Sequence, residues 1–155
     1  MINLVYTLEE CWYLSPPWGK EIPLLSVNLL ERVYVTTTKS FGYCCGVEWL
    51  QQEWNYAVAL NDEVVYTSAS QLIGTGKLEL GIDRPVFALG ERVVFRCNRD
   101  FSKLRIVQGI HRIDDFWAYT VEWASPELCE CDGKLIASGD RRAWVTDTDL
   151  VRVSI

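Results

Sequence analysis

Large apolar residues alternate with small or polar residues in two stretches of this chain, residues 54–60 and residues 117–123. The alternating positions are Trp54, Tyr56, Val58 and Leu60 in the first stretch and Trp117, Tyr119, Val121 and Trp123 in the second. A period of two places successive side chains on opposite faces of a β-strand. Both stretches are therefore predicted to be strands with one buried face.

The two stretches belong to an internal repeat that runs through most of the chain. Short blocks recur in the same order, and the matched residues include Glu31 and Glu91, Phe41 and Phe101, Gly46 and Gly109, Tyr56 and Tyr119, and Tyr66 and Trp144. The separation between matched residues is 60 at Glu31, 63 from Gly46 through Val58 and 78 at Tyr66. It changes only between blocks, as expected when loops lengthen and strands do not. The repeat predicts two similar units, residues 1–76 and residues 77–155.

Further strands are predicted from runs of β-branched and aromatic residues. These runs occupy residues 32–35, 64–67, 92–95 and 150–153. Two more strands are predicted to begin at Gly46 and Gly109, because glycine permits a sharp bend. Each unit also contains a step rich in Ser, Thr or Asp, at residues 68–71 and 146–149, which favours a single helical turn before the last strand.

The second unit contains an insertion near residues 126–140. Within it, Asp132-Gly133 separates two short runs, residues 129–131 and 134–136. An Asp-Gly pair in this position is typical of a two-residue type I′ hairpin. We therefore predict a hairpin that extends the sheet.

The order of the predicted elements, with Glu-Arg-Val at residues 31–33 and 91–93, resembles a small SH3-like barrel, the group that includes Tudor and KOW-type modules. The resemblance implies an all-β fold of two tandem SH3-like five-stranded barrels related by internal duplication, with an N-terminal extension. It implies little about a ligand, because the matching residues are mostly predicted core positions. The whole chain, and residues 10–19 in particular, also resembles a family of uncharacterised cyanobacterial proteins of similar length.

The N-terminal extension has no counterpart of similar length before the second unit. The capping-box spacing of Thr7 and Glu10 allows a short helix, whereas residues 4–6 suit an added strand, and both interpretations remain open. Residues 15–18 include two prolines, which have no amide hydrogen to donate. This part is predicted to be extended and to pack a tryptophan across a barrel.

Composition and charge narrow the range of partners. The formal net charge is -6, which opposes general attraction to nucleic-acid phosphates or anionic lipid. The sequence shows neither a basic leader nor an apolar stretch of about 20 residues, so we expect a cytoplasmic protein with no membrane partner. The six cysteines are expected to be reduced thiols. With one histidine and no Cys-x-x-Cys pair, they predict no metal site.

Aromatic residues in or beside the predicted loops are the first candidate binding residues. They are Phe41, Tyr43, Trp49, Phe101 and Phe116. Aromatic faces can hold cations or pack against a partner, although filling a core is their commoner use. We predict a non-enzymatic interaction module that presents these aromatics and the hairpin of the second unit to a protein or peptide partner.

A basic stretch at residues 96–112 supports an alternative, a nucleic-acid-binding double barrel. The stretch contains Arg96, Arg99, Lys103, Arg105 and Arg112 against a single Asp100. Phosphate contacts from Arg99 and Arg105, with a base stacked on Phe101, would form the site. A solvated strand edge explains the same charges, and the net charge of the chain favours that interpretation.

An enzyme is the second alternative. The candidate set is Cys44 or Cys45 as nucleophile, His111 as base, and Asp114 or Asp115 to orient the base. These residues would act together only if the fold brought them into contact, and no catalytic signature surrounds them. Glycine-rich phosphate loops are absent, so no cofactor is predicted. The sequence leaves the oligomeric state and the identity of the partner open.

Overall fold

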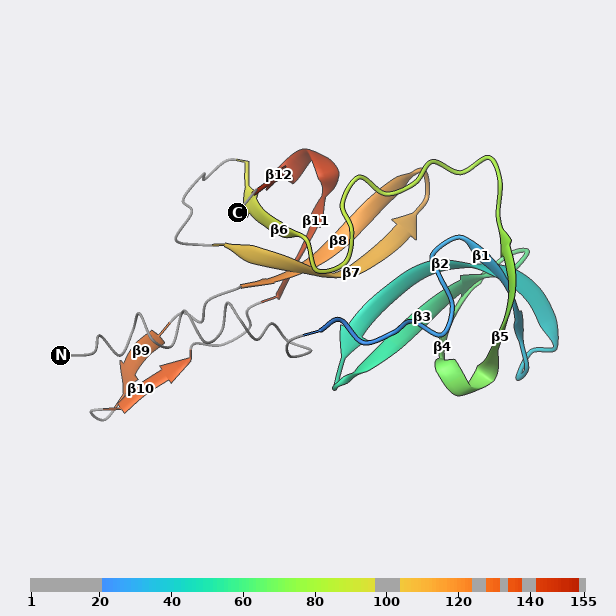
Figure 1. Cartoon of the computed structure of the whole chain (residues 1–155), viewed down its shortest axis with the longest axis horizontal. Helices are drawn as coiled ribbons and strands as arrows, with labels where there is room; N and C mark the ends of the chain where they lie inside the picture. Colours follow the sequence, from blue (N-terminus) through green and yellow to red (C-terminus); the bar gives the residue numbers. More distant parts are fainter. Residues whose placement is uncertain (1–20, 97–103, 124–127, 132–133, 138–141, 154–155) are drawn as a thin grey trace.

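The computed structural model of the chain describes residues 21–96, 104–123, 128–131, 134–137 and 142–153 (Figure 1). Strands and two short 3-10 turns make up the regular structure of these residues, which confirms the all-β prediction. No helix in this part of the chain is long and apolar enough to cross a bilayer. The predictions for the N-terminal extension fall on residues outside these ranges.

The first half contributes five strands. Their bounds are β1 (Glu31–Val35), β2 (Ser40–Leu50), β3 (Glu53–Ala59), β4 (Val64–Ser68) and β5 (Leu72–Leu78). Antiparallel pairing gives the strand order β5-β1-β2-β3-β4. The 3-10 turn η1 (Ala69–Gln71) leads into β5, where the sequence predicted a helical turn.

The second half repeats this arrangement. Its strands are β6 (Arg92–Phe95), β7 (Arg105–Ile113), β8 (Phe116–Trp123), β11 (Arg142–Thr146) and β12 (Leu150–Arg152). They follow the order β12-β6-β7-β8-β11, and the 3-10 turn η3 (Asp147–Asp149) precedes the last strand. Matched residues of the repeat therefore lie on matching strands: Tyr56 on β3 corresponds to Tyr119 on β8.

All ten strands belong to one open antiparallel sheet. Among the described residues, β4, β5, β11 and β12 each pair with a single neighbouring strand. The two closed barrels implied by the resemblance to SH3-like modules are therefore not established by this pairing.

The inserted hairpin is present but does not join the main sheet. β9 (Leu128–Cys131) pairs with β10 (Lys134–Ala137) in a separate two-stranded sheet. The prediction that the hairpin extends the sheet is wrong, because among the described residues β9 and β10 pair with one another and with no strand of the main sheet. The predicted type I′ turn at residues 132–133 lies outside the described ranges.

The long strands begin earlier than the glycines suggested. β2 begins at Ser40 rather than at Gly46, and β7 begins at Arg105 rather than at Gly109. The pairing register shifts directly before each glycine, as in a β-bulge. A bulge bends a strand without ending it. The part of β2 before its bulge therefore pairs with β1, and the part after it pairs with β7.

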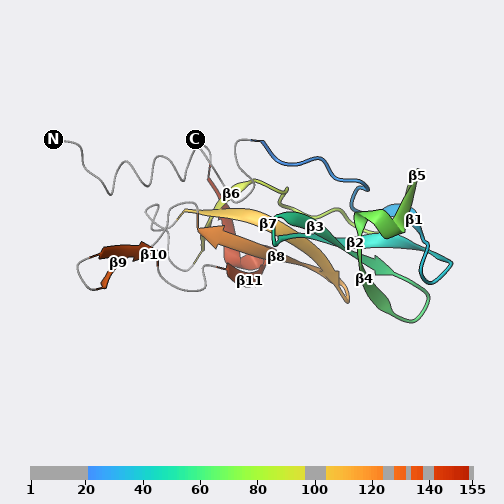
Figure 2. The same ribbon diagram turned by 90° about the horizontal axis from the view of Figure 1, so that it is seen from below.

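Pairing between β2 and β7 joins the two halves (Figures 1 and 2). The opposed residues are Gly46 and His111, Val47 and Ile110, and Glu48 and Gly109. Val47 and Ile110 are equivalent positions of the repeat, and so are Glu48 and His111. Each strand thus meets its own repeat, and the junction has approximate twofold symmetry about the Val47–Ile110 pair.

The alternating residues form the cores of the two halves. The first cluster includes Val33, Val47, Trp54, Tyr56 and Val58, and the second includes Val93, Ile110, Trp117, Tyr119 and Val121. Leu30 precedes β1 but packs in the second cluster, and Leu29 and Leu89 contact both clusters. Burying each large side chain contributes about 1.5–3 kcal/mol, so this shared packing stabilises the halves against one another.

Replacing Gly46 is expected to disturb the junction. A Cβ at this position would lie 2.4 Å from Nδ1 of the buried His111 ring. We expect Gly46→Ala to lower the free energy of unfolding by about 1–3 kcal/mol, as overpacked sites do. At the equivalent Gly109 the nearest atom is Cγ of Glu48 at 2.9 Å, a longer contact with a side chain that is more flexible than the His111 ring. Urea denaturation should show a smaller loss for Gly109→Ala, and equal losses would contradict this explanation.

Candidate functional site

A groove of about 940 Å³ lies between two segments that cross the core face of the sheet. One segment precedes β1 and contributes residues 25 and 28–30 to the lining, and the other links β5 to β6 and contributes residues 78–91 except Asp83. Ile110 of β7 also lines the groove. The site is therefore built where the two halves meet. One wall comes from the segment before the strands of the first half, and the other comes from the segment after them.

Tryptophan and tyrosine side chains hold the crossing segments in place. Trp117 Nε1 donates to the Asp83 carbonyl at 2.8 Å, and the Tyr119 hydroxyl accepts from the amides of Val86 at 2.9 Å and Phe87 at 3.4 Å. The first half has the same arrangement. There Trp54 Nε1 donates to the Pro23 carbonyl at 3.0 Å, and the Tyr56 hydroxyl accepts from the Ser26 amide at 2.9 Å. The repeated Trp-x-Tyr motif thus anchors the wall of the groove.

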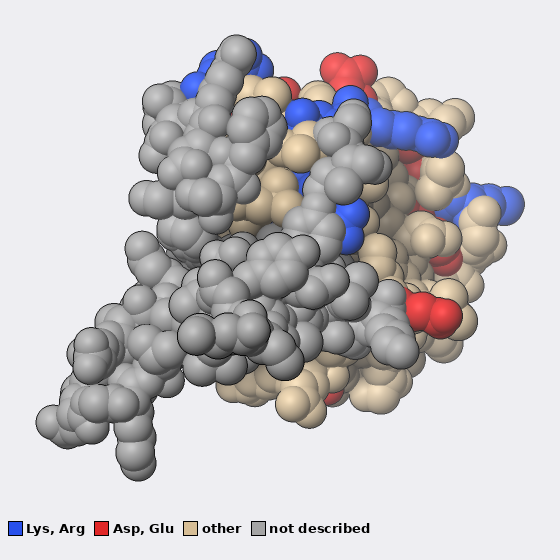
Figure 3. All heavy atoms as spheres, turned by 60° about the vertical axis from the view of Figure 1, so that its left-hand side comes forward, with Lys and Arg blue, Asp and Glu red and all other residues tan. Residues whose placement is uncertain are grey.

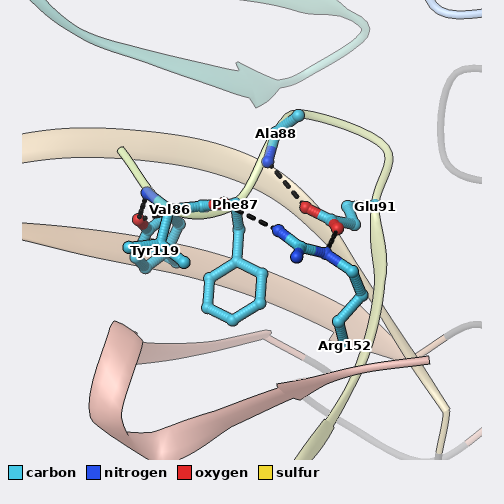
Figure 4. Close-up of polar contacts among 6 residues, drawn as sticks. All are labelled: Val86, Phe87, Ala88, Glu91, Tyr119 and Arg152. Carbon is cyan, nitrogen blue, oxygen red and sulfur yellow. Dashed lines mark hydrogen bonds and ion pairs between the residues drawn. The ribbon is translucent and has the colours of Figure 1, made fainter. Parts of the chain in front are cut away.

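Arg152 and Glu91 complete this wall (Figure 4). The Glu91 carboxylate accepts from the Ala88 amide at 2.9 Å and forms an ion pair with Arg152 Nε. Arg152 Nη2 also donates to the Val86 carbonyl at 2.8 Å, and its guanidinium lies 5.4 Å from the centre of the Phe87 ring. The last described strand thereby fixes the segment that precedes β6.

The lining of the groove is mainly apolar, and its charges are balanced. Exposed apolar side chains at the groove include Leu80, 87% exposed, and Val86, 54% exposed. Three of the charged side chains that line the groove already have partners, since Glu79 forms an ion pair with Arg32 at 2.6 Å and Glu91 forms one with Arg152. The surface therefore favours apolar groups and gives little electrostatic preference.

Tyr119→Phe is expected to loosen the groove wall. The substitution removes the acceptor of two backbone amides while leaving the ring in place. A buried donor without a partner costs about 1–3 kcal/mol, and we expect a loss of unfolding free energy in that range. Tyr66→Phe is the matched control, because Tyr66 is 76% exposed. Chemical denaturation and amide exchange at Val86 and Phe87 report the effect, and unchanged protection at both amides would contradict it.

The aromatic candidates from the sequence do not gather at the groove. Phe41 lies on β2, 59% exposed and 5.0 Å from the Tyr34 ring, and Tyr43 is half-buried on the same strand. Trp49 packs edge-on against Trp54 at 5.1 Å beside the first core. Phe116, 45% exposed, begins β8. Phe101 lies outside the described residues.

The basic stretch is divided between elements of the fold, because residues 105–112 belong to β7. Arg105 is buried with its guanidinium 4.1 Å from the centre of the Phe95 ring, and Arg112 lies 5.4 Å from the centre of the Trp117 ring. Arg96 Nε donates to the Thr148 carbonyl at 2.9 Å. In the view of Figure 3 the described Lys and Arg side chains lie in separate groups. Arg99 and Lys103 fall outside the described ranges.

The cysteine and histidine candidates partly meet. Cys45, His111 and Asp114 line a second pocket of about 440 Å³, whereas Cys44 belongs to the first core. Burial raises the pKa of Cys45 to about 11 and that of Cys44 to about 12, and burial lowers the pKa of His111 to about 4. Near neutral pH these shifts favour a protonated thiol and a neutral imidazole. The geometry brings the residues together but the electrostatics oppose a thiolate nucleophile.

The crossing segments were missed by the sequence analysis, although a signal for them exists. The separation of 60 residues that relates Glu31 to Glu91 also relates Leu29 to Leu89 and Ile22 to Ile82. The repeat therefore begins upstream of the first predicted strand. Extending the comparison would have indicated two equivalent apolar segments leading into β1 and β6.

Fold and site together define an all-β chain of two repeated halves with an apolar groove between their crossing segments. The chain belongs to the family described as "Protein of unknown function (DUF1392)", which it matches over residues 1–153. No curated protein and no solved structure matches the chain.

Proposed function

We propose that this chain is a non-enzymatic interaction module whose groove holds an apolar segment of a protein partner. The observation that carries the proposal is the exposed apolar lining at Leu80 and Val86 beside an already buried floor at Ile110. An open apolar surface between rigidly held walls is suited to side chains from another protein.

The polar groups at the groove favour this class of partner over a polar small molecule. Glu91 and Arg152 are paired with one another, and Glu79 is paired with Arg32, so few charges are left to orient a polar ligand. Phosphate recognition is less well supported than apolar binding, because the described arginines at residues 96–112 make contacts within the chain. Affinity would instead come from apolar burial, which is nearly independent of salt.

We also propose that each half is an SH3-like barrel, with units at residues 1–76 and 77–155. The shared strand order and the 3-10 turn before the last strand of each half support this interpretation. A reducing, cytoplasmic location is proposed from the free thiols of Cys44 and Cys45. The high pKa values of these thiols support the absence of cysteine catalysis.

Selection of random peptides displayed on phage tests the groove. Peptides selected on the chain should share apolar residues, and isothermal titration should show little change in affinity as salt rises. Leu80→Asp is expected to weaken binding by about tenfold or more, because it places a charge among apolar contacts.

Leu24→Asp is the matched control for this experiment. Leu24 is 95% exposed and is not one of the residues lining the groove, so its substitution should leave affinity unchanged. Peptides that bind both variants as tightly as the parent chain would place the interaction elsewhere. Binding of single-stranded nucleic acid that falls steeply with salt would support the alternative.

A further inference from the structure

The face of the sheet opposite the groove carries the second pocket. Ile110 lines the groove and His111 lines the pocket, and successive residues of a strand point to opposite faces. The two sites are therefore separated by the sheet itself. Nothing in the proposed function of the groove requires this pocket.

Small residues at the junction leave room for the pocket between two aromatic side chains. Across the strands, Tyr66 lies opposite Ala57 on β3, and Gly46 lies opposite His111 on β7. Tyr66 and Trp144 both line the pocket and are 76% and 54% exposed. They are equivalent residues of the repeat, so each half supplies one aromatic wall.

Three hydrogen-bond acceptors lie on the same face of the sheet as Trp144, and one of them, His111, lines the pocket. His111 Nε2 lies 3.6 Å from the Glu48 carboxylate, and the Trp144 ring lies 5.1 Å from the His111 ring. The Thr120 hydroxyl and the Glu48 Cγ both lie within about 3 Å of the point where a Gly109 Cβ would be, at 3.0 Å and 2.9 Å. Glu48 therefore approaches both of the other side chains.

Two of these polar atoms have no hydrogen-bond partner among the described residues, although they are buried. They are His111 Nε2 and Thr120 Oγ1, in residues that are 8% and 0% exposed. A buried polar group without a partner costs about 1–3 kcal/mol, so such groups in a folded protein point to something that satisfies them. Burial keeps the imidazole neutral near pH 7, and with its proton on Nδ1 the Nε2 atom is an acceptor.

We propose that this pocket binds a primary ammonium group, with the ammonium directed toward His111, Thr120 and Glu48 and its alkyl chain between Tyr66 and Trp144. An alkylammonium carries three N–H donors and no acceptor, which suits a group of three acceptors. Aromatic faces add cation–π attraction. Asp114 and Arg112 both line the pocket, so their charges offset one another there, and the Arg112 guanidinium lies 5.4 Å from the centre of the Trp117 ring.

Entry requires movement of a neighbouring side chain such as Trp144, because His111 Nε2 is buried and the Trp144 ring lies 5.1 Å from the imidazole. Trp144 lies on β11, which pairs only with β8 among the described strands, and half of its surface is exposed. A side chain at such an edge can change rotamer without disturbing a core. The ammonium comes either from a lysine side chain of a protein or from a free amine, and these two sources share the same chemistry.

The single histidine of the chain makes the test specific. In the full chain labelled with ¹⁵N-histidine, n-butylammonium should shift the Nε2 resonance of His111 saturably near neutral pH. Tetramethylammonium keeps the charge without N–H donors, and 1-butanol keeps a donor without charge, so each should bind about tenfold more weakly or worse. No saturable shift with n-butylammonium, or equal affinity for tetramethylammonium, would overturn the proposal.

Variants locate the binding in the pocket. Trp144→Ala and Tyr66→Ala, both at exposed residues, should weaken n-butylammonium binding by about tenfold while the protein stays folded. Phe41→Ala removes an exposed aromatic side chain outside the pocket and should have no effect. Unchanged affinity in both pocket variants would overturn the proposal. A lysine-containing peptide that binds tighter than n-butylammonium would assign the cation to a protein, and equal affinity would assign it to a free amine.

Discussion

Ile110→Ala is expected to lower the free energy of unfolding by about 2–5 kcal/mol, the usual range for truncating a buried isoleucine. Ile110 is 1% exposed, belongs to the core of the second half and lies opposite Val47 of the first half. Its truncation leaves a cavity at the centre of the junction, where both halves pack. Urea denaturation followed by tryptophan fluorescence measures the loss.

Ile113→Ala is the control on the same strand. Ile113 is 43% exposed near the end of β7, so its truncation should cost well under half as much. The same pair of variants tests whether the two cores depend on one another, because Ile110→Ala would destabilise only the second half if its core were confined to that half. If Ile110→Ala unfolded the second half while the first half kept its stability, the shared junction would be refuted.

The second large effect is a loss of stability between pH 6.5 and pH 4. Burial lowers the pKa of His111 from 6.5 to about 4, although the Glu48 carboxylate lies 3.6 Å from Nε2. As pH falls through this window the unfolded chain takes up a proton on His111 and the folded chain does not. The free energy of unfolding therefore falls by roughly 3 kcal/mol across this window. The contribution of the neutral His111 to stability is fully present above pH 6.5 and is lost by about pH 4.

The difference between the parent chain and His111→Gln isolates this contribution. The free energy of unfolding of the variant should fall less steeply from pH 6.5 to pH 4, because it lacks the imidazole whose proton uptake differs between the folded and the unfolded chain. Asp149 is a useful comparison, since hydrogen bonds from Thr146 lower its pKa from 3.8. Its contribution is lost only as pH falls below that value. Equal slopes for the parent chain and His111→Gln would contradict the burial of a neutral imidazole.

The sequence pattern predicts the strands that carry Tyr56 and Tyr119 but not the contacts of their hydroxyl groups. Alternation at Tyr56 and Tyr119 correctly predicted two buried strand faces. It did not indicate that each hydroxyl would accept hydrogen bonds from a segment about 30 residues earlier, because contacts between distant segments leave no local period. The groove depends on those contacts, so its lining could not be found from periodicity.

The roles of Gly46 and Gly109 extend beyond the bend of their own strands. Gly46 and Gly109 were predicted as strand beginnings because glycine allows a bend, and they instead follow bulges within longer strands. The space that they create is used across the junction, by the His111 ring over Gly46 and by Glu48 over Gly109. Only the pairing of β2 with β7 makes that use apparent.

The amino-acid sequence alone determined the all-β class, the repeat and most strand positions, because alternation and turn chemistry are local properties read along one chain. The tertiary structure decided how the halves meet. It placed β2 against β7, held two crossing segments over the cores, and brought Glu48 beside His111 and Thr120. These arrangements depend on packing between residues far apart in the chain, which no local pattern specifies.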